Sequence, residues 1–330
     1  MWFEQLTGFK EESPENVRNK IELNGNEMIS LVNERRFVFG QLEIPSLAEL
    51  KALTHKIDAF DGQIKVSEIV ANVQELHRQP ENANALFQAA SQFNLLEMIS
   101  PSVTPEEGIA RYEYDRTQGP ACAISCGAGT IYRNYFVEVN GQIGQTEDNQ
   151  IDCLDLIGKA LGNHKSELWT MKNGYTLVNP KGLKTINEKL ASLSQLERED
   201  LKDKLKTGIQ WNTDVTLPDA QHQVSQIYCS ALPVAYNHNI ETSHWEAFSR
   251  IILEATYEST ILAAVLNLEK NKSNKVYLTL VGGGAFGNEE QWILESLQKV
   301  IRKFKNLPLD VKIVSYGRSN PNLVRCIDGI

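Results

Sequence analysis

KVYLTLVGGGAFGNEEQWILESLQKVIRKFKNLPLDVKIVSYG, residues 275–317, is the stretch that decides the fold of this chain. It opens with a continuous apolar run, Lys275 to Val281, and passes through a glycine-rich loop. An amphipathic segment from Glu289 to Phe304 follows, and a second apolar run ends the stretch. A strand, a loop, a helix and a strand in this order predict a βαβ unit with parallel strands.

The glycine-rich loop consists of Gly282, Gly283, Gly284, Ala285, Phe286, Gly287 and Asn288. Glycine permits positive φ and close approach of a phosphate, and the N-terminus of the following helix adds partial positive charge. The loop fits neither the Gly-x-x-x-x-Gly-Lys-Ser/Thr pattern nor the dinucleotide Gly-x-Gly-x-x-Gly pattern. We therefore predict a phosphate-binding loop of another kind. The aromatic residues Phe286 and Tyr316 either flank the ligand or simply pack.

The rest of the chain extends this unit into a larger α/β domain. Residues 209–217 predict a strand, residues 224–236 a strand or a helix, and residues 244–270 a long helix. Together they predict an α/β fold with a mixed, largely parallel sheet flanked by helices. Upstream, the apolar spacing in residues 65–100 predicts two helices. Residues 111–145 predict a loop and two strands, with a hairpin turn at Asn140-Gly141.

The chain divides into two parts by these patterns. Residues 1–100 are assigned to an N-terminal α+β appendage packed on the main domain, and residues 101–330 to that domain.

Charge and composition limit the kinds of partner. The chain has 33 basic and 42 acidic residues, and its net charge of -9 disfavours general binding of nucleic acid. It shows neither a signal-like N-terminus nor a run of about 18 apolar residues, so we expect a cytoplasmic protein without membrane association. The five cysteines are sparse and odd in number, as in reduced thiols. None of the six histidines is spaced for a metal site, so we predict surface histidines, no metal and no cofactor.

The loop Gly282–Asn288, with the helix after it and the strand end Val314-Ser315-Tyr316-Gly317, resembles the second phosphate loop of macrodomains. In poly(ADP-ribose) glycohydrolases the matching stretch reads Gly-Cys-Gly-Ala-Phe-Gly followed by Gly or Asn. The resemblance implies a macrodomain-like fold, a ligand that is ADP-ribose or an ADP-ribosylated protein, and hydrolysis of an ADP-ribosyl bond. The residues Val224-Ser225-Gln226 take the place of the glycohydrolase Gln-Glu-Glu helix and supply no carboxylate.

Candidate catalytic acids are therefore sought elsewhere. Asp214 follows a predicted strand, where α/β folds place functional side chains, although it could also cap a turn. Asp115 lies in a stretch rich in Gly and Pro, and Glu258 lies on the apolar side of the long helix, where a carboxylate needs a partner or a proton. Thr117, Gln118 and Asn134 are candidate ligand contacts in the same stretch. The alternative is that Asp115 and Thr117 cap a turn and that Asn134 satisfies neighbouring backbone groups. Two functions remain open: an ADP-ribosyl hydrolase, and a non-catalytic reader of ADP-ribose or a related nucleotide.

Overall fold

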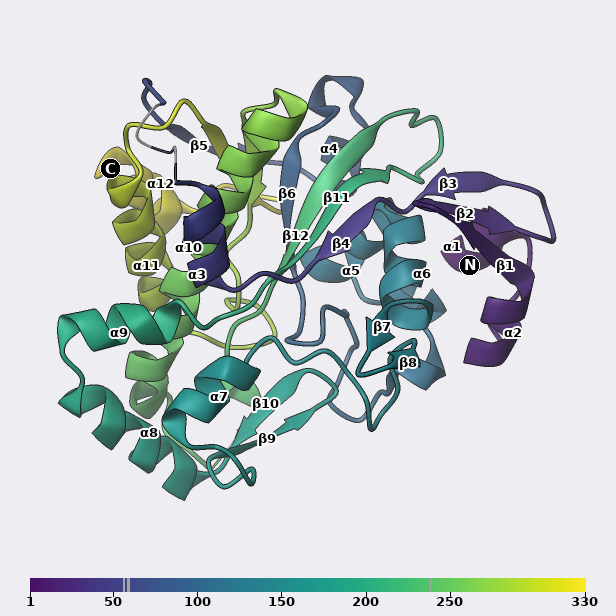
Figure 1. Ribbon diagram of the computed structural model, residues 1–330. Helices are drawn as coiled ribbons and strands as arrows, with labels where there is room; N and C mark the ends of the chain where they lie inside the picture. Colours follow the sequence, from purple (N-terminus) through teal and green to yellow (C-terminus); the bar gives the residue numbers. More distant parts are fainter. Residues whose placement is uncertain (56, 58–59, 238) are drawn as a thin grey trace.

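The computed structural model describes residues 1–55, 57, 60–237 and 239–330. Its centre is a seven-stranded sheet in the order β4-β11-β12-β6-β13-β14-β5. Figure 1 shows β4, β11, β12 and β6 of this sheet side by side. The strands are Gln41–Glu43 (β4), Lys65–Val70 (β5), Leu86–Ala90 (β6), Gly208–Asp214 (β11), Gln223–Cys229 (β12), Lys275–Leu278 (β13) and Asp310–Ser315 (β14). Strands β12, β6, β13, β14 and β5 pair in parallel, whereas β11 is antiparallel to both of its neighbours. The predicted mixed, largely parallel sheet is confirmed.

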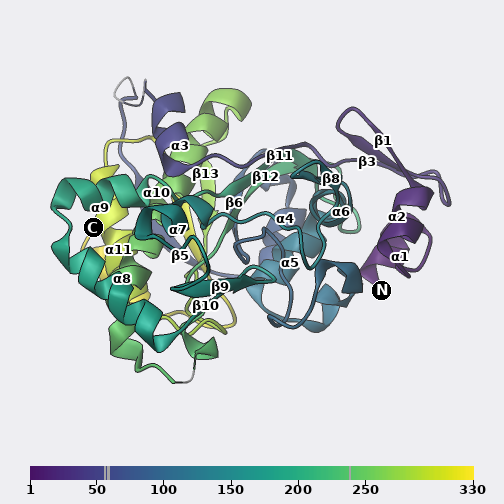
Figure 2. The same cartoon turned by 60° about the horizontal axis from the view of Figure 1, so that its bottom comes forward.

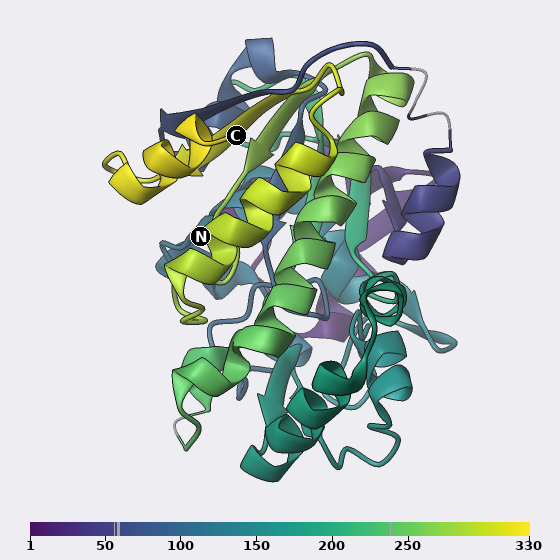
Figure 3. The same cartoon turned by 90° about the vertical axis from the view of Figure 1, so that its left-hand side faces the viewer.

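Helices cover both faces of this sheet (Figure 3). One face carries α3 (Leu47–Leu53), α10 (Glu246–Asn271) and α11 (Glu290–Lys303), and the other carries α4 (Val73–Arg78), α5 (Gln118–Ser125) and α6 (Gly127–Tyr135). By length and composition the segment Thr242–Asn271 could cross a membrane, but 89% of its most apolar window is buried in the protein. Such burial is typical of a core helix.

The division of the chain at residue 100 is corrected by the structure. Helices α1 (Trp2–Thr7) and α2 (Pro14–Lys20) and the small sheet β1-β2-β3 lie at one end of the molecule, away from the C-terminus (Figure 2). The three small strands are Ile21–Asn24, Glu27–Ser30 and Arg36–Val38. Residues 41–90, however, supply β4, β5 and β6 to the central sheet. Most of β6 is buried, and periodicity cannot distinguish such a strand from a buried helix.

The middle of the chain also differs from the prediction. Residues 118–135 form α5 and α6 rather than strands, and only the hairpin at Asn140-Gly141, between β7 (Glu138–Val139) and β8 (Gln142–Ile143), is confirmed there. The remaining elements are α7 (Asp155–Leu161), β9 (Trp169–Lys172), β10 (Tyr175–Val178), α8 (Pro180–Ser192), α9 (Gln195–Lys202) and α12 (Pro321–Asp328). Short 3₁₀ segments are Pro80–Asn82, Pro105–Glu107, Ala110–Tyr114, Val234–Tyr236 and Thr242–Trp245.

The candidate acid Glu258 lies in a structural ion cluster. Its side chain is only 2% exposed, and its carboxylate bonds Lys51 of α3 at 3.2 Å and Lys303 of α11 at 2.5 Å. Both lysines neutralise a carboxylate that burial would otherwise penalise. Glu258 therefore joins α10 to its two neighbouring helices.

We predict that Glu258→Gln lowers the free energy of unfolding by about 1–3 kcal/mol, because it breaks a buried pair whose lysine partners are partly exposed. Chemical denaturation measures the loss. Glu188→Gln is the control, since Glu188 is 65% exposed and its nearest lysine nitrogen is 3.9 Å away. A loss no larger than that of the control would contradict the structural role.

One of the histidines expected at the surface, His77, is fully buried in α4, while His238 lies outside the described residues. The His77 Nδ1–H donates to the Val73 carbonyl at 2.7 Å, and Nε2 accepts from the Gln226 side chain at 3.0 Å. Burial lowers the pKa of His77 to about 4, because the charged ring would lose its hydration. The folded protein thus holds this ring neutral.

This depressed pKa predicts acid sensitivity. Between pH 6.5 and about 4 the unfolded chain protonates His77 and the folded chain does not, so folding stability falls as the pH falls. The contribution is up to about 3 kcal/mol. In His77→Gln the free energy of unfolding should therefore depend less steeply on pH across this range. Equal slopes for the two proteins, measured by urea denaturation, would show that His77 does not titrate on unfolding.

Candidate functional site

A cleft of about 1140 Å³ opens where β5, β13 and β14 end. Asn72 follows β5, Thr279 follows β13, and Tyr316 follows β14, and all three line the cleft. The opposite wall is formed by residues 115–118 at the start of α5. Parallel α/β sheets commonly bind ligands outside the carboxyl ends of their strands. The volume is sufficient for a nucleotide-sized ligand.

The glycine-rich loop forms one side of the cleft through Gly283, Gly284 and Asn288. Gly282 and Gly287 have φ values of 83° and 69°, which L side chains rarely adopt. A Cβ at Gly282 would lie 2.5 Å from the Ala231 Cβ, so the loop also needs glycine for its close packing. Asn288 closes the loop, because its backbone N–H donates to the Gly282 carbonyl at 2.9 Å.

Several N–H groups of this region are unused. Within the part of the chain that the structure describes, the N–H groups of Gly284, Ala285 and Phe286 donate no hydrogen bond. The N-cap of α11, Glu289, makes no side-chain cap, so the first N–H groups of α11 are also without a side-chain acceptor. A loop of free donors followed by a helix N-terminus is suited to an anion.

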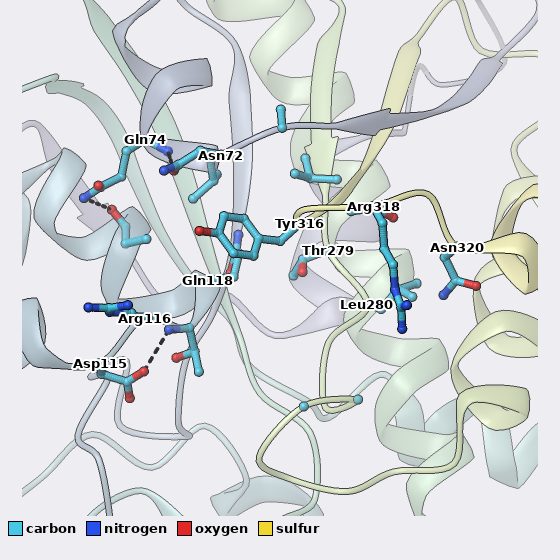
Figure 4. Close-up of a pocket in the computed structure, with 18 of the residues that line it drawn as sticks. Asn72, Gln74, Asp115, Arg116, Gln118, Thr279, Leu280, Tyr316, Arg318 and Asn320 are labelled. Carbon is cyan, nitrogen blue, oxygen red and sulfur yellow. Dashed lines mark hydrogen bonds between the residues drawn. The ribbon is translucent and has the colours of Figure 1, made fainter.

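A second loop, residues 316–320, projects over the cleft from the end of β14 (Figure 4). Tyr316 is 77% exposed, and its ring points toward the side where Gln118 and Arg116 lie, whereas Arg318 points away from that side. The exposed ring offers an aromatic face to a ligand in the cleft.

Two carboxylates hold this second loop. Glu68 of β5 accepts hydrogen bonds from the Ser315 hydroxyl at 2.5 Å and from the Asn320 N–H at 2.7 Å, and also from the Ser319 hydroxyl. Glu290, at the start of α11, accepts from the Asn320 side chain at 2.6 Å and also from Asn322. These amide donors, Asn320 first, lower the pKa of Glu290. The loop is therefore tied to the sheet and to α11.

The wall at α5 carries Asp115, Arg116, Thr117 and Gln118. The Asp115 Oδ1 accepts the Thr117 N–H at 2.8 Å, so this carboxylate has a fixed position (Figure 4). The Gln118 carboxamide is bonded within the protein: it accepts the Ala90 N–H at 2.8 Å, donates to the Gln88 carbonyl at 2.7 Å, and has the Cys122 Sγ 3.1 Å from its Nε2. Gln118 thus lines the cleft without a free amide for a ligand.

Other predicted site residues lie elsewhere. Asn134 is buried and donates to the Pro105 carbonyl at 3.0 Å. Phe286 packs against Tyr175 and Tyr236, with ring centroids 5.4 and 5.9 Å away, rather than lining the cleft. Glu258 bonds Lys303 in the last turn of α11, roughly 20 Å along that helix from the cleft.

Asp214 does not reach the cleft either. It ends β11, but β11 runs against its neighbour, so this end lies at the opposite edge of the sheet, beside Gln223. Its carboxylate accepts the Val38 N–H at 2.7 Å and the Gln223 side chain at 3.0 Å. The expected position at the ligand edge is corrected, and Asp214 instead joins the N-terminal lobe to the sheet.

The segment assigned to the glycohydrolase helix is also corrected. Residues 223–229 form β12, a strand in the interior of the sheet. Helix α5 starts at the wall of the cleft opposite the strand ends, and its first turn reads Gln118-Gly119-Pro120, without a carboxylate.

Asn72, Arg116 and Arg318 also line the cleft and were not predicted from the sequence. Arg318 directly follows the recognised Tyr316-Gly317 strand end, so that position could have revealed it. Neither arginine forms a salt bridge with any residue that the structure describes. In the same ranges, no group of three His, Cys, Asp or Glu residues is placed to hold a metal ion.

Comparison with protein-family models finds no match, and no curated protein matches the chain. Comparison with solved structures does find similar chains. The chain is similar to poly(ADP-ribose) glycohydrolase from Deinococcus radiodurans in complex with ADP-ribose, at 10% identity and a TM-score of 0.44, over 87% of this chain and 92% of that one. It is also similar to the enzyme from Thermomonospora curvata, at 9% identity and a TM-score of 0.45, over 94% and 93% of the two chains.

Proposed function

We propose that this protein binds ADP-ribose in the cleft between α5 and the loop Gly282–Asn288. The observation that carries the proposal is the unused N–H group of Gly284, which lines the cleft, followed by the uncapped start of α11, whose Glu290 lines it too. Among the described residues, the neighbouring N–H groups of Ala285 and Phe286 are also unused. These donors would hold the diphosphate, which carries two negative charges at neutral pH. The resemblance of this loop to the macrodomain phosphate loop selects ADP-ribose among nucleoside diphosphates.

The surroundings of the loop support the same ligand. Tyr316 is the exposed aromatic residue over the cleft and would stack on the base or a ribose. Arg116 and Arg318 supply positive charge at the cleft of a protein whose net charge is -9. Local hydrogen-bond donors and cations of this kind can attract an anion although the protein carries a net negative charge.

We further propose that the cleft hydrolyses an ADP-ribosyl group attached to a protein. Water breaks the bond between the distal ribose and the protein, ADP-ribose is released, and Asp115 is the acid that protonates the leaving group. Cleavage of a glycosidic bond needs a carboxylate that donates a proton or activates water. Asp115 lines the cleft, and its Oδ1 is held by the Thr117 N–H at 2.8 Å. The second carboxylate oxygen, Oδ2, makes no hydrogen bond with the described residues and is left for the substrate.

A non-catalytic reader of ADP-ribose is the second candidate. It is favoured by the first turn of α5, which places Gly119 and Pro120 at the cleft end of the helix without a carboxylate. Turnover by the wild-type protein separates the two functions.

Gly284→Glu should weaken ADP-ribose binding at least tenfold, because it adds a negative side chain where the diphosphate approaches and removes about 1.5–3 kcal/mol per lost charge-assisted bond. Gly284→Ala is the matched control, with an affinity within about twofold of wild type. A Cβ at Gly284 meets no atom within 4 Å, so both variants should fold. Calorimetric titration with ADP-ribose, AMP and NAD measures the effect. If Gly284→Glu and wild type bind ADP-ribose with equal affinity, the glycine-rich loop does not bind the diphosphate.

Asp115→Asn should keep ADP-ribose affinity within a few-fold and lower hydrolysis of an ADP-ribosylated protein by roughly 10²-fold or more, as expected for a lost general acid or base. Asparagine retains the oxygen that accepts the Thr117 N–H, so the local geometry is preserved. Release of ADP-ribose is the measurement. Full activity of the variant would exclude Asp115, and an inactive wild type that still binds would identify a reader.

A further inference from the structure

The central sheet splits between β6 and β13 directly behind the cleft. Strand β6 pairs with β12 along its whole length, from Leu86 to Ala90. It pairs with β13 at Leu86 and Phe87 alone. The backbone N–H and C=O groups of the odd-numbered residues of β6 point toward β12, since the Ala85 carbonyl and the Ser91 N–H bond that strand. The backbone groups of Gln88 and Ala90 therefore point the other way, to the side where β13 no longer pairs with β6.

The side chain of Gln118 occupies the gap. Its Oε1 accepts the Ala90 N–H at 2.8 Å, and its Nε2 donates to the Gln88 carbonyl at 2.7 Å. In a parallel sheet a neighbouring residue opposite position 89 would bond these same two groups. One carboxamide therefore replaces the backbone of a missing strand residue.

A second glutamine closes the other side of the split. Gln88, which is fully buried, accepts the Thr279 N–H through Oε1 at 3.1 Å and donates through Nε2 to the Thr260 hydroxyl at 2.8 Å. Thr279 lines the cleft and leads into the glycine-rich loop. Hydrogen bonds thus run from the start of α5 through the end of β6 to the end of β13.

We infer that Gln118 is a positioning residue, which sets the distance between the α5 wall, with Asp115, and the glycine-rich loop across the cleft. The role assigned to Gln118 is to fix the first turn of α5 to β6. The effect on binding rests on the proposed function, whereas the attachment of α5 to β6 does not. The test therefore has two arms.

The first arm measures amide hydrogen exchange without ligand. In Gln118→Leu the Ala90 N–H loses its acceptor, so exchange should become faster at Ala90 and across residues 115–121, and remain unchanged in β12. Exchange at wild-type rates in these residues overturns the inference whatever the ligand.

The second arm uses Gln118→Glu and titration with ADP-ribose. An ionised carboxylate can accept from Ala90 but cannot donate to the Gln88 carbonyl, so at about pH 8 binding should be about tenfold weaker than in wild type. A protonated carboxyl regains one donor and one acceptor. The ratio of the variant's Kd to the wild-type Kd, measured at the same pH, should therefore fall from about ten toward one as the pH is lowered from about 8 to about 5.

Gln298→Glu is the matched control. Gln298 is also half-buried and donates to a main-chain carbonyl, that of Cys326 at 3.1 Å, but it lies outside the cleft. The affinity of Gln298→Glu for ADP-ribose should stay within twofold of wild type at every pH. If Gln118→Glu binds ADP-ribose as tightly as wild type at every pH, Gln118 has only a structural role and the inference is overturned. A wild type that binds no ADP-ribose would instead refute the proposed function, and the exchange arm would still decide the attachment.

Discussion

The parting of β6 and β13 after Phe87 is the constraint on which the cleft depends. An interior strand that loses its neighbour exposes backbone donors and acceptors, and unpaired groups of this kind are costly when buried. Here Gln118 and Gln88 satisfy them with side-chain amides. The sheet can therefore open at its carboxyl edge without losing its hydrogen bonds, and the opening is where a ligand can enter.

Electrostatics at the cleft is local rather than global. The chain is acidic overall, and Glu68 and Glu290 both lie around the second loop. Each of these carboxylates accepts hydrogen bonds from hydroxyl or amide donors, which hold residues 316–320 in place and leave the carboxylates ionised. Arg116 and Arg318 have no such partner among the described residues, and the free N–H groups of the glycine-rich loop add to them. An anion in the cleft would therefore meet two arginines and free N–H donors on one part of its wall, and the carboxylates Glu113, Asp115 and Glu290 on others.

The sequence predicted elements correctly where the pattern lies within one contiguous segment. It misled where a residue's position depends on the direction in which a strand runs in the sheet. Residues 275–317 form the predicted strand, loop, helix and strand because each element carries its own local pattern. Asp214 was misplaced because a strand end was equated with the ligand edge, and β11 is antiparallel. The start of α5 was missed because Gly119 and Pro120 are typical of a turn. No local pattern reveals that a glutamine side chain will pair with a strand 28 residues away.

The packing of α5 also limits where an acidic side chain can lie on this wall of the cleft. A Cβ at Gly119 would stand 1.8 Å from the Ala90 carbonyl oxygen, so no side chain fits at the second position of the helix. Pro120, next in the chain, is buried as well. The same close approach that lets Gln118 reach β6 thereby excludes a side chain from the position that follows it. Helix α5, Gln118–Ser125, contains no acidic residue, so an acid of this wall precedes the helix, and Asp115, held by the Thr117 N–H, is the carboxylate nearest to the N-cap.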